Sequence, residues 1–246
     1  MLQIVLPMAG RGQRFVQAGY RLPKPLLPVR GEPMAALVVR NVRPQRPHRF
    51  IFLCLREHLR DHGLGGILAA VAPEGVVVPV DGVTEGAACT VLLARDHFDP
   101  DQPLMTANCD QWVDTSIDDY LARADAEAAD GYLMTMTDRD PNWSFAALDD
   151  RGLVTRVEEK RPISDQATVG IYNFARARHF LDGADAMIAQ DLRVNGEFYV
   201  APVYNRMIAA GLTVRTCNVG PVSTVMHGLG VPEDYEAFLR RGAAPG

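Results

Sequence analysis

The chain has 246 residues, of which 48% are apolar and 22% charged, the balance of an ordinary globular protein. Its net charge of −5 argues against general nucleic-acid binding, and no apolar run reaches the ~18 residues that a membrane span needs. The four cysteines are scattered without metal-ligand spacing, so we expect a reduced, cytoplasmic protein with no membrane or nucleic-acid partner.

In the first half, residues 1–129, predicted strands alternate with predicted helices. Strands are expected over residues 2–6, 49–55, 75–80 and 103–107. Helices are expected over residues 34–42, 56–62, 86–95 and 117–129, with a loose apolar stretch after residue 62. This alternation predicts a doubly wound, largely parallel α/β arrangement.

From residue 130 the pattern changes to strands with little helix between them. Strands are expected over residues 131–137, 144–148, 153–158, 168–174 and 213–218, with a hairpin turn at 149–152. Helices are expected over residues 175–190 and 199–210 and from residue 232 onward. We expect antiparallel strands here and, since no linker is visible, one domain over residues 1–246.

The loop after the first strand has the composition of a phosphate site. Gly10 and Gly12 allow a sharp turn, and consecutive backbone N–H groups in such a loop form an anion cradle. Arg11 and Arg14 add guanidinium donors, and Lys24 is held between two prolines. This combination suggests binding of a triphosphate.

A dinucleotide-binding loop and an ordinary surface turn are the alternatives at this position. Phe15 stands where the dinucleotide fingerprint has its third glycine, and the Gly-Lys-Ser/Thr sequence of a P-loop is absent. Both differences favour another kind of nucleotide site.

Basic residues are concentrated at the start of the chain. Residues 1–62 hold 11 Lys+Arg against 3 Asp+Glu, whereas residues 63–246 hold 14 against 27. A polyphosphate site requires such positive charge, although a solvated basic face would also explain part of it. Of the 25 basic residues only Lys24 and Lys160 are lysines, and both fall in candidate motifs.

The pattern Met-Ala-Gly-x-Gly-x-Arg-Phe, followed by Pro-Lys-Pro-Leu-Leu-Pro-Val-x-Gly-x-Pro-Met, extends to residue 34. It resembles the nucleotidyltransferases that make nucleotide-sugars and related activated phosphates. The resemblance implies a Rossmann-like mixed β-sheet flanked by helices, with a nucleotide-binding half (about 1–129) and an acceptor-binding half (about 130–246). It also implies attack of a phosphate monoester on the α-phosphate of a nucleoside triphosphate, with release of pyrophosphate. The residues implied at the nucleotide are Met8, Ala9, Gly10, Gly12, Arg14 and Lys24.

Asp110 follows a predicted buried strand, which is where open α/β sheets bind ligands. It resembles the family's Mg²⁺ ligand, and Mg²⁺ typically takes one or two carboxylates together with phosphate oxygens and waters. An aspartate that only caps the next loop is the alternative. The resemblance also implies a second metal-binding Asp near the C-terminus, but Gly228 stands at that position, with His227 beside it as a substitute ligand.

The segment Thr84-Glu85-Gly86 leads from a strand into a helix and resembles the family segment that reads the nucleobase. Gly86 would let a base or ribose approach the backbone. A helix entry capped by Thr84 or Glu85 is the alternative. Nothing in the segment identifies the base.

The segment Glu158-Glu159-Lys160 resembles the family's Glu-Lys pair at the acceptor. The resemblance implies that Lys160 holds the acceptor phosphate and Glu159 a hydroxyl, with Gly170 and Glu197 in the same subsite. A solvated surface triplet is the alternative. The resemblance implies a sugar 1-phosphate or a related phosphate monoester or phosphonate as acceptor, and the residues do not identify which.

Two other functions stay open. A glycosyltransferase of similar fold would use a nucleotide-sugar with Asp110 as metal ligand, but that substrate needs fewer cations than Arg14 and Lys24 provide. A catalytically silent nucleotide-binding module is the other, suggested by Gly228. Homo-oligomerisation is open as well.

Overall fold

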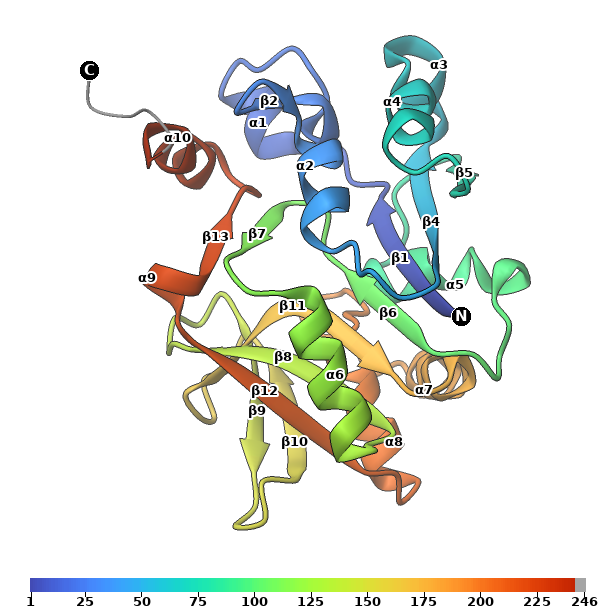
Figure 1. The fold of residues 1–246 in the computed structure, drawn as a ribbon, viewed down its shortest axis with the longest axis vertical. Helices are drawn as coiled ribbons and strands as arrows, with labels where there is room; N and C mark the ends of the chain where they lie inside the picture. Colours follow the sequence, from blue (N-terminus) through green and yellow to red (C-terminus); the bar gives the residue numbers. More distant parts are fainter. Residues whose placement is uncertain (242–246) are drawn as a thin grey trace.

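The structure, a computed structural model, describes residues 1–241 and is built around one mixed β-sheet of nine strands (Figure 1). Along the main path the order is β10-β9-β11-β6-β1-β4-β5, and β8 pairs with both β11 and β12. The strands of this sheet are β1 (Leu2–Met8), β4 (His48–Leu55), β5 (Val76–Val80), β6 (Leu104–Ala107), β8 (Gly131–Thr137), β9 (Ser144–Leu148), β10 (Val154–Glu159), β11 (Gln166–Phe174) and β12 (Val214–Pro221).

The strand directions confirm the predicted change of pattern. β1 runs parallel to β4 and β6, and β4 runs parallel to β5. β11 then pairs antiparallel with β6, β8 and β9, while β12 is parallel to β8. The fold is therefore the predicted α/β class with a mixed sheet.

Helices cover both faces of the sheet, and an apolar core lies between the sheet and the helices on each face. One core includes residues of α2, α4, α6 and α10, and the other includes residues of α5, α7 and α8. The helices are α1 (Gln13–Gln17), α2 (Met34–Asn41), α3 (Arg56–His62), α4 (Leu64–Val71), α5 (Ala87–Leu92), α6 (Ile117–Glu127), α7 (Ala177–Ala189), α8 (Val203–Ala209), α9 (Val222–Val225) and α10 (Pro232–Arg241), with 3₁₀ turns η1 (Lys24–Leu26) and η2 (Arg95–His97).

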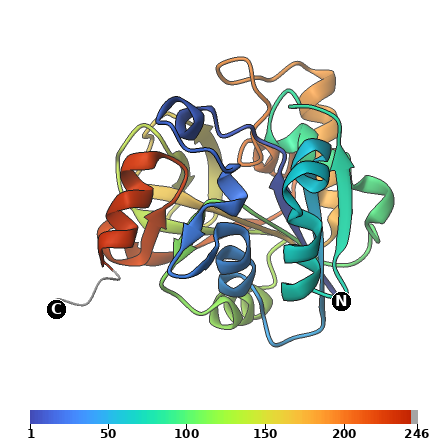
Figure 2. The ribbon, with the colours of Figure 1, turned by 90° about the horizontal axis from the view of Figure 1, so that it is seen from above.

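Two small ribbons lie outside the main sheet. One pairs β2 (Pro28–Val29) with β3 (Glu32–Pro33), and the other pairs β7 (Gln111–Val113) with β13 (Met226–Gly228). The second ribbon brings the chain just before α10 against the segment that follows β6. In both views α10 lies on the opposite side of the molecule from β5 (Figures 1 and 2).

Helical predictions were wrong at two places. Residues 64–71 form α4, where the sequence suggested a loose stretch, because Leu64 and Leu68 are fully buried against the first core. That packing outweighs the low helix propensity of Gly65 and Gly66. In the second half, α8 begins at Val203 rather than near residue 199, directly after Pro202.

No helix within residues 1–241 is both long enough and apolar enough to cross a membrane.

Candidate active site

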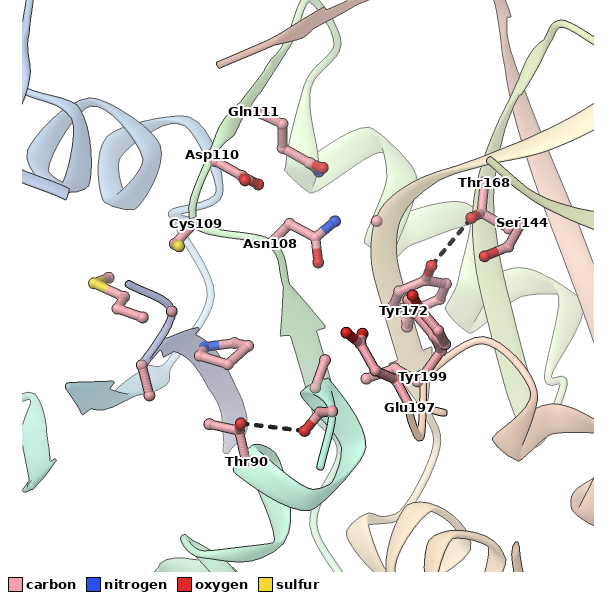
Figure 3. Close-up of a pocket in the computed structure, with 18 of the residues that line it drawn as sticks. Thr90, Asn108, Cys109, Asp110, Gln111, Ser144, Thr168, Tyr172, Glu197 and Tyr199 are labelled. Atoms are coloured by element: carbon pink, nitrogen blue, oxygen red, sulfur yellow. Dashed lines mark hydrogen bonds between the residues drawn. The ribbon is translucent and has the colours of Figure 1, made fainter. Parts of the chain in front are cut away.

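A cleft of about 550 Å³ opens at the carboxyl ends of β1 and β6 (Figure 3). β1 lies between β6 on one side and β4 on the other. After β1 the chain continues to β4, whereas after β6 it continues to strands on the opposite side, so β1 and β6 form a switch point of the sheet. Such switch points are where open α/β sheets bind ligands, and a cleft of this size accommodates small molecules.

Most of the residues singled out from the sequence line this one cleft. Those that do are Met8, Ala9, Gly10, Arg14, Lys24, Thr84, Gly86, Asp110, Glu159, Lys160, Gly170 and Glu197. Four others are not among the lining residues: Arg11, Gly12, Glu85 and His227. The structure thus unites residues from both halves of the chain, while what each of them binds stays a prediction.

Lys24 and Asp110 form an ion pair in the cleft. Lys24 Nζ lies 2.6 Å from Asp110 Oδ2, and their side chains are 15% and 26% exposed. Burial acts to lower the pKa of Lys24, but the adjacent Asp110 carboxylate outweighs it and raises that pKa overall. The lysine is therefore a fixed cation throughout the physiological range.

The backbone around Asp110 is held closely by the segment that follows β13. Leu229 N donates to Asp110 O at 2.8 Å. A Cβ atom at Gly230 would lie 2.8 Å from Asp110 Oδ2, so a larger residue there would displace the carboxylate or this segment. The pairing of β7 with β13 thus fixes the direction in which Asp110 faces the cleft.

The residues around Asp110 fit a metal ion that arrives with a nucleotide. Residues 1–241 contain no cluster of three or more His, Cys, Asp and Glu side chains that could hold a metal by themselves. Mg²⁺ does not need such a cluster, because phosphate oxygens and waters complete its shell around one carboxylate. Gly228 offers no ligand, and a Cβ atom there would lie 3.0 Å from Asp234 Oδ2.

His227 does not share this environment. Its Nε2 lies 2.8 Å from Asp114 Oδ2, and its Nδ1 lies 3.1 Å from Arg241 Nη1. A guanidinium only donates, so Nδ1 accepts and Nε2 carries the hydrogen that is donated to Asp114. With both ring nitrogens engaged and the side chain outside the cleft, His227 does not serve as the substitute ligand considered from the sequence.

Gly12 and Gly86 both allow close backbone packing beside the cleft, although only Gly86 lines it. Gly12 has φ of 60° and begins α1, with Lys24 Cβ 3.1 Å from where its own Cβ would be. Gly86 has φ of 136°, and a Cβ there would lie 2.5 Å from Phe198 N. This glycine therefore lets the loop before α5 pack on the loop before α8.

Glu85 takes part in that same packing. Its carboxylate pairs with Arg193 at 2.5 Å, and its carbonyl accepts from Phe198 N at 2.8 Å. Neither Glu85 nor Thr84 caps α5, whose N-cap is Gly86 without a side-chain hydrogen bond. The capped helix entry considered from the sequence is therefore wrong.

The other side of the cleft carries two carboxylates and the second lysine. Glu159 is buried and accepts a hydrogen bond from the Ser144 hydroxyl, and burial is the main cause that raises its pKa. Lys160 Nζ donates to Tyr199 Oη at 2.8 Å, which raises the pKa of Lys160, and it lies 5.0 Å from the Tyr199 ring centroid. The solvated triplet considered from the sequence thus does not describe the buried Glu159, whereas Lys160 is exposed to solvent.

Gly170 lies at an irregularity of β11, where the pairing register with β8 shifts between Thr168 and Tyr172. Its φ is 79°, and a Cβ there would meet the carboxamides of Asn108 and Gln111, the latter at 2.6 Å from Oε1. Neither carboxamide was singled out from the sequence. The sequence offered one indication of Gln111, which is that this polar residue directly follows Asp110.

The sequence of this chain is similar to those of known proteins. A protein-family model described as nucleotidyl transferase matches residues 3–186. The bifunctional protein GlmU of Burkholderia mallei (strain SAVP1) is 28% identical over 222 residues, which cover 87% of this chain and 46% of that protein. The chain thus spans about half the length of the curated relatives it matches.

Solved structures resemble the chain over nearly its whole length. The nucleoside-diphosphate-sugar pyrophosphorylase of Vibrio cholerae RC9 is 27% identical with a TM-score of 0.84, covering 96% of this chain and 99% of that one. The inositol-1-phosphate CTP transferase of T. maritima is 14% identical with a TM-score of 0.71, covering 99% and 98% respectively. The second likeness concerns the fold alone.

Proposed function

Because the chain belongs to the nucleotidyl transferase family, we propose that it transfers a nucleoside monophosphate from a nucleoside triphosphate to a phosphate-bearing acceptor. The acceptor is a sugar 1-phosphate or a related phosphate monoester or phosphonate, and pyrophosphate is released. The name of the Vibrio cholerae structure supports this substrate class.

One observation carries the proposal. The chain has only two lysines, and both line the same cleft from different elements, Lys24 from η1 and Lys160 from the end of β10. Two phosphate-bearing substrates repel each other unless each is neutralised. A single nucleotide-sugar, the substrate of the rival glycosyltransferase, needs no second cation at its sugar.

The reaction requires positioning and charge neutralisation more than proton transfer. An oxygen of the acceptor phosphate attacks the α-phosphorus, and the bond from that phosphorus to the bridging oxygen breaks, so pyrophosphate leaves with the electron pair. Lys24 and Arg14 stabilise the charge that develops on the triphosphate. Lys160 brings the acceptor phosphate into line, and no general base is needed because a phosphate dianion is already ionised.

We also propose a divalent cation, Mg²⁺ or another, with Asp110 as its protein ligand. When bound, such an ion neutralises charge on the phosphates. Full turnover in EDTA would contradict the assignment. Calorimetric titration of Mg²⁺ with the nucleotide present should show weaker binding to Asp110→Asn than to the wild type, independently of activity.

Pyrophosphate release from four nucleoside triphosphates, each combined with a panel of phosphate monoesters and phosphonates, tests the function. We expect turnover with one nucleotide and one class of acceptor. Nucleotide binding without turnover would support a silent module instead. Transfer from a nucleotide-sugar would support a glycosyltransferase. We place the enzyme in the cytoplasm, since each cysteine is a thiol and nucleoside triphosphates are made there.

A further inference from the structure

Tyr235 on α10 packs against the loop that carries Arg14. Its buried ring makes edge-to-face contacts with Phe15 and with Tyr20, each at a centroid separation of 5.8 Å. Phe15 and Tyr20 meet each other in the same way at 5.3 Å. Aromatic contacts of this geometry stabilise beyond the area that they bury. Because Phe15 directly follows Arg14 in α1, this aromatic cluster fixes the helix from which the arginine enters the cleft.

The hydroxyl of Tyr235 contacts a second segment, the one that carries Lys24. It donates to the carbonyl oxygen of Pro28 at 2.7 Å. Lys24 begins the turn η1 just before Pro28, and its carbonyl accepts from Leu27 N at 3.1 Å. Leu26 and Leu27 are buried in the first core. The position of Pro28 therefore also constrains that of Lys24.

These two segments touch each other at the edge of the cleft. A Cβ at Gly12 would lie 3.1 Å from Lys24 Cβ, and Phe15 N donates to Gly12 O at 2.9 Å. Tyr235 joins the segments from outside, since it does not line the cleft. α10 lies beside α1 and β2 (Figures 1 and 2) and outside residues 3–186, which the family model matches.

α10 is tied to this region at further points. Tyr20 Oη donates to Glu236 Oε1 at 3.0 Å, which adds a second link between the loop and the helix. The chain reaches α10 through Leu229 and Gly230, which lie against the backbone and the carboxylate of Asp110. The start of α10 is therefore in contact with, or directly continuous with, the segments that hold all three charged groups assigned to the nucleotide and its metal.

We propose that Tyr235 is a positioning residue for the nucleotide: it holds Arg14 and Lys24 at the separation at which both cations reach one triphosphate. This inference rests on the proposed function and adds to it a residue that touches neither substrate. Cations on two loosely held segments would have to be ordered when the triphosphate binds, and that ordering weakens binding. The apparent Kd rises as the fraction of molecules with the binding-competent arrangement falls.

The variant Tyr235→Phe keeps the aromatic cluster and removes only the hydroxyl that donates to Pro28. Tyr235→Leu removes the ring as well. Tyr120→Phe is the matched control, because the Tyr120 hydroxyl also donates to a backbone carbonyl at 2.7 Å, that of Tyr132, but lies outside the cleft. Each protein is titrated calorimetrically with ATP, GTP, CTP and UTP in the presence of Mg²⁺. The other readouts are acceptor KM at saturating nucleotide, the melting temperature, and amide hydrogen exchange over residues 13–28.

We expect Tyr235→Phe to raise the Kd of the nucleotide that the wild type binds by about three- to tenfold, the range for one hydrogen bond. Tyr235→Leu should raise it further. Acceptor KM should change by less than about twofold, because the acceptor side is untouched. Exchange over residues 13–28 should be faster in Tyr235→Phe without ligand. Tyr120→Phe should lower the melting temperature by a similar amount but leave the Kd and this exchange unchanged.

An equal Kd in Tyr235→Phe and wild type would overturn the inference, and Tyr235 would then only pack α10 onto the fold. The same rise in Kd for Tyr120→Phe would also overturn it, since lost stability alone would explain the effect. Tyr235→Phe decides the matter even where Tyr235→Leu does not fold. If the wild type bound a nucleotide without releasing pyrophosphate, the proposed function would fall while the Kd comparison still tested Tyr235. Binding of none of the four nucleotides would refute both.

Discussion

Lys24 and Asp110 are partly buried charges in direct contact. The effect of replacing one of them on the free energy of unfolding therefore depends on whether the other is still charged. Their side chains are only 15% and 26% exposed. Removing one partner leaves the other charge poorly solvated, whereas removing both charges avoids that penalty. Catalysis, in contrast, needs both groups, because we assign the lysine to the triphosphate and the carboxylate to the metal.

We therefore predict opposite patterns for activity and stability in a double-mutant cycle. Lys24→Ala should reduce turnover by about 10²–10⁴-fold, the range for losing a charge-stabilising donor. It should also lower the free energy of unfolding by about 1–3 kcal/mol, since Asp110 loses its partner. Lys24→Ala/Asp110→Asn should be more stable than the sum of the single effects implies. Urea unfolding measures this, and strictly additive single effects would show that the pair is not coupled.

Glu159 gives the protein a measurable pH dependence. Burial raises its pKa in the folded protein, against the opposing hydrogen bond from Ser144. A carboxyl group with a raised native pKa stabilises the fold below its unfolded pKa of about 4.3 and loses that contribution as pH rises through the native value.

Glu159→Gln stays neutral, so its stability relative to the wild type should increase as pH rises from about 4 through this window. Unfolding free energies of the two proteins, measured at a series of pH values, test the prediction. Glu158→Gln, at the neighbouring position on β10, controls for the removal of one negative charge. A constant difference between Glu159→Gln and wild type at all pH values would contradict the prediction.

At the scale of elements, the loop before α5 and the loop before α8 behave as one unit. Phe198 N donates to Glu85 O, and Ala88 N donates to Phe198 O at 3.0 Å. Arg193 adds an ion pair to Glu85 and places its guanidinium carbon 4.2 Å from the Phe198 ring centroid. Glu197 and Tyr199 flank Phe198 and line the cleft, as Gly86 does, so this contact links two segments of the cleft wall.

Gly86→Ala should disrupt the contact between the loop before α5 and the loop before α8. The added Cβ would lie 2.5 Å from Phe198 N at a backbone φ of 136°, so the two loops must separate. We expect a loss of about 2–3 kcal/mol in unfolding free energy and weaker use of both substrates. Gly66→Ala, inside α4 with open space around it, should instead be neutral or stabilising by up to about 1 kcal/mol. Equal stability of Gly86→Ala and wild type would show that the contact is dispensable.

The same elements show what the sequence could predict. Strands β8 and β9 have the predicted bounds of residues 131–137 and 144–148, because their signals are local: apolar, β-branched or aromatic runs between turn residues. The β7–β13 ribbon was missed, since its three-residue strands gain their pairing from a partner more than a hundred residues away. Local patterns carry no information on such pairings.

The residues of the cleft likewise differ in whether their neighbours in sequence or their distant contacts identify them. Residues inside continuous motifs, such as Arg14, Lys24 and Asp110, could be singled out because their neighbours in sequence identify them. The contact of Gly86 with Phe198, the pair of Glu85 with Arg193 and the place of Gln111 over Gly170 depend on the tertiary fold. Glu85, Gly86 and Gly170 were singled out from the sequence, but these contacts were not, because the partner of each residue lies far away along the chain.

At the scale of the molecule, the cleft lies between the parallel part and the antiparallel part of the nine-stranded sheet. The parallel strands β1 and β6 end at Met8 and Ala107, next to Lys24 and Asp110. The antiparallel strands β9, β10 and β11 contribute Ser144, Glu159 and Gly170 from the other side. Under the proposed function, each substrate would therefore contact its own set of elements.

This division predicts that Lys160→Ala affects the acceptor and spares the nucleotide. Lys160 adopts φ of 56° at the end of β10, an unusual conformation for a lysine, and its ammonium is held by Tyr199. We expect a large rise in acceptor KM and a fall in kcat, with the nucleotide Kd changed by less than about threefold, because uniform nucleotide binding is untouched.

The variant Tyr199→Phe separates the lysine's charge from its placement. It keeps the ring beside the ammonium and removes only the hydroxyl that accepts from Lys160, so its effect on acceptor KM should be smaller than that of Lys160→Ala but in the same direction. Kinetics with the acceptor varied and calorimetric titration of the nucleotide alone distinguish these outcomes. A collapse of nucleotide binding in Lys160→Ala, with acceptor KM unchanged, would show that the two lysines do not serve separate substrates. The triphosphate would then extend across the cleft to both cations, and the acceptor would have to enter from elsewhere.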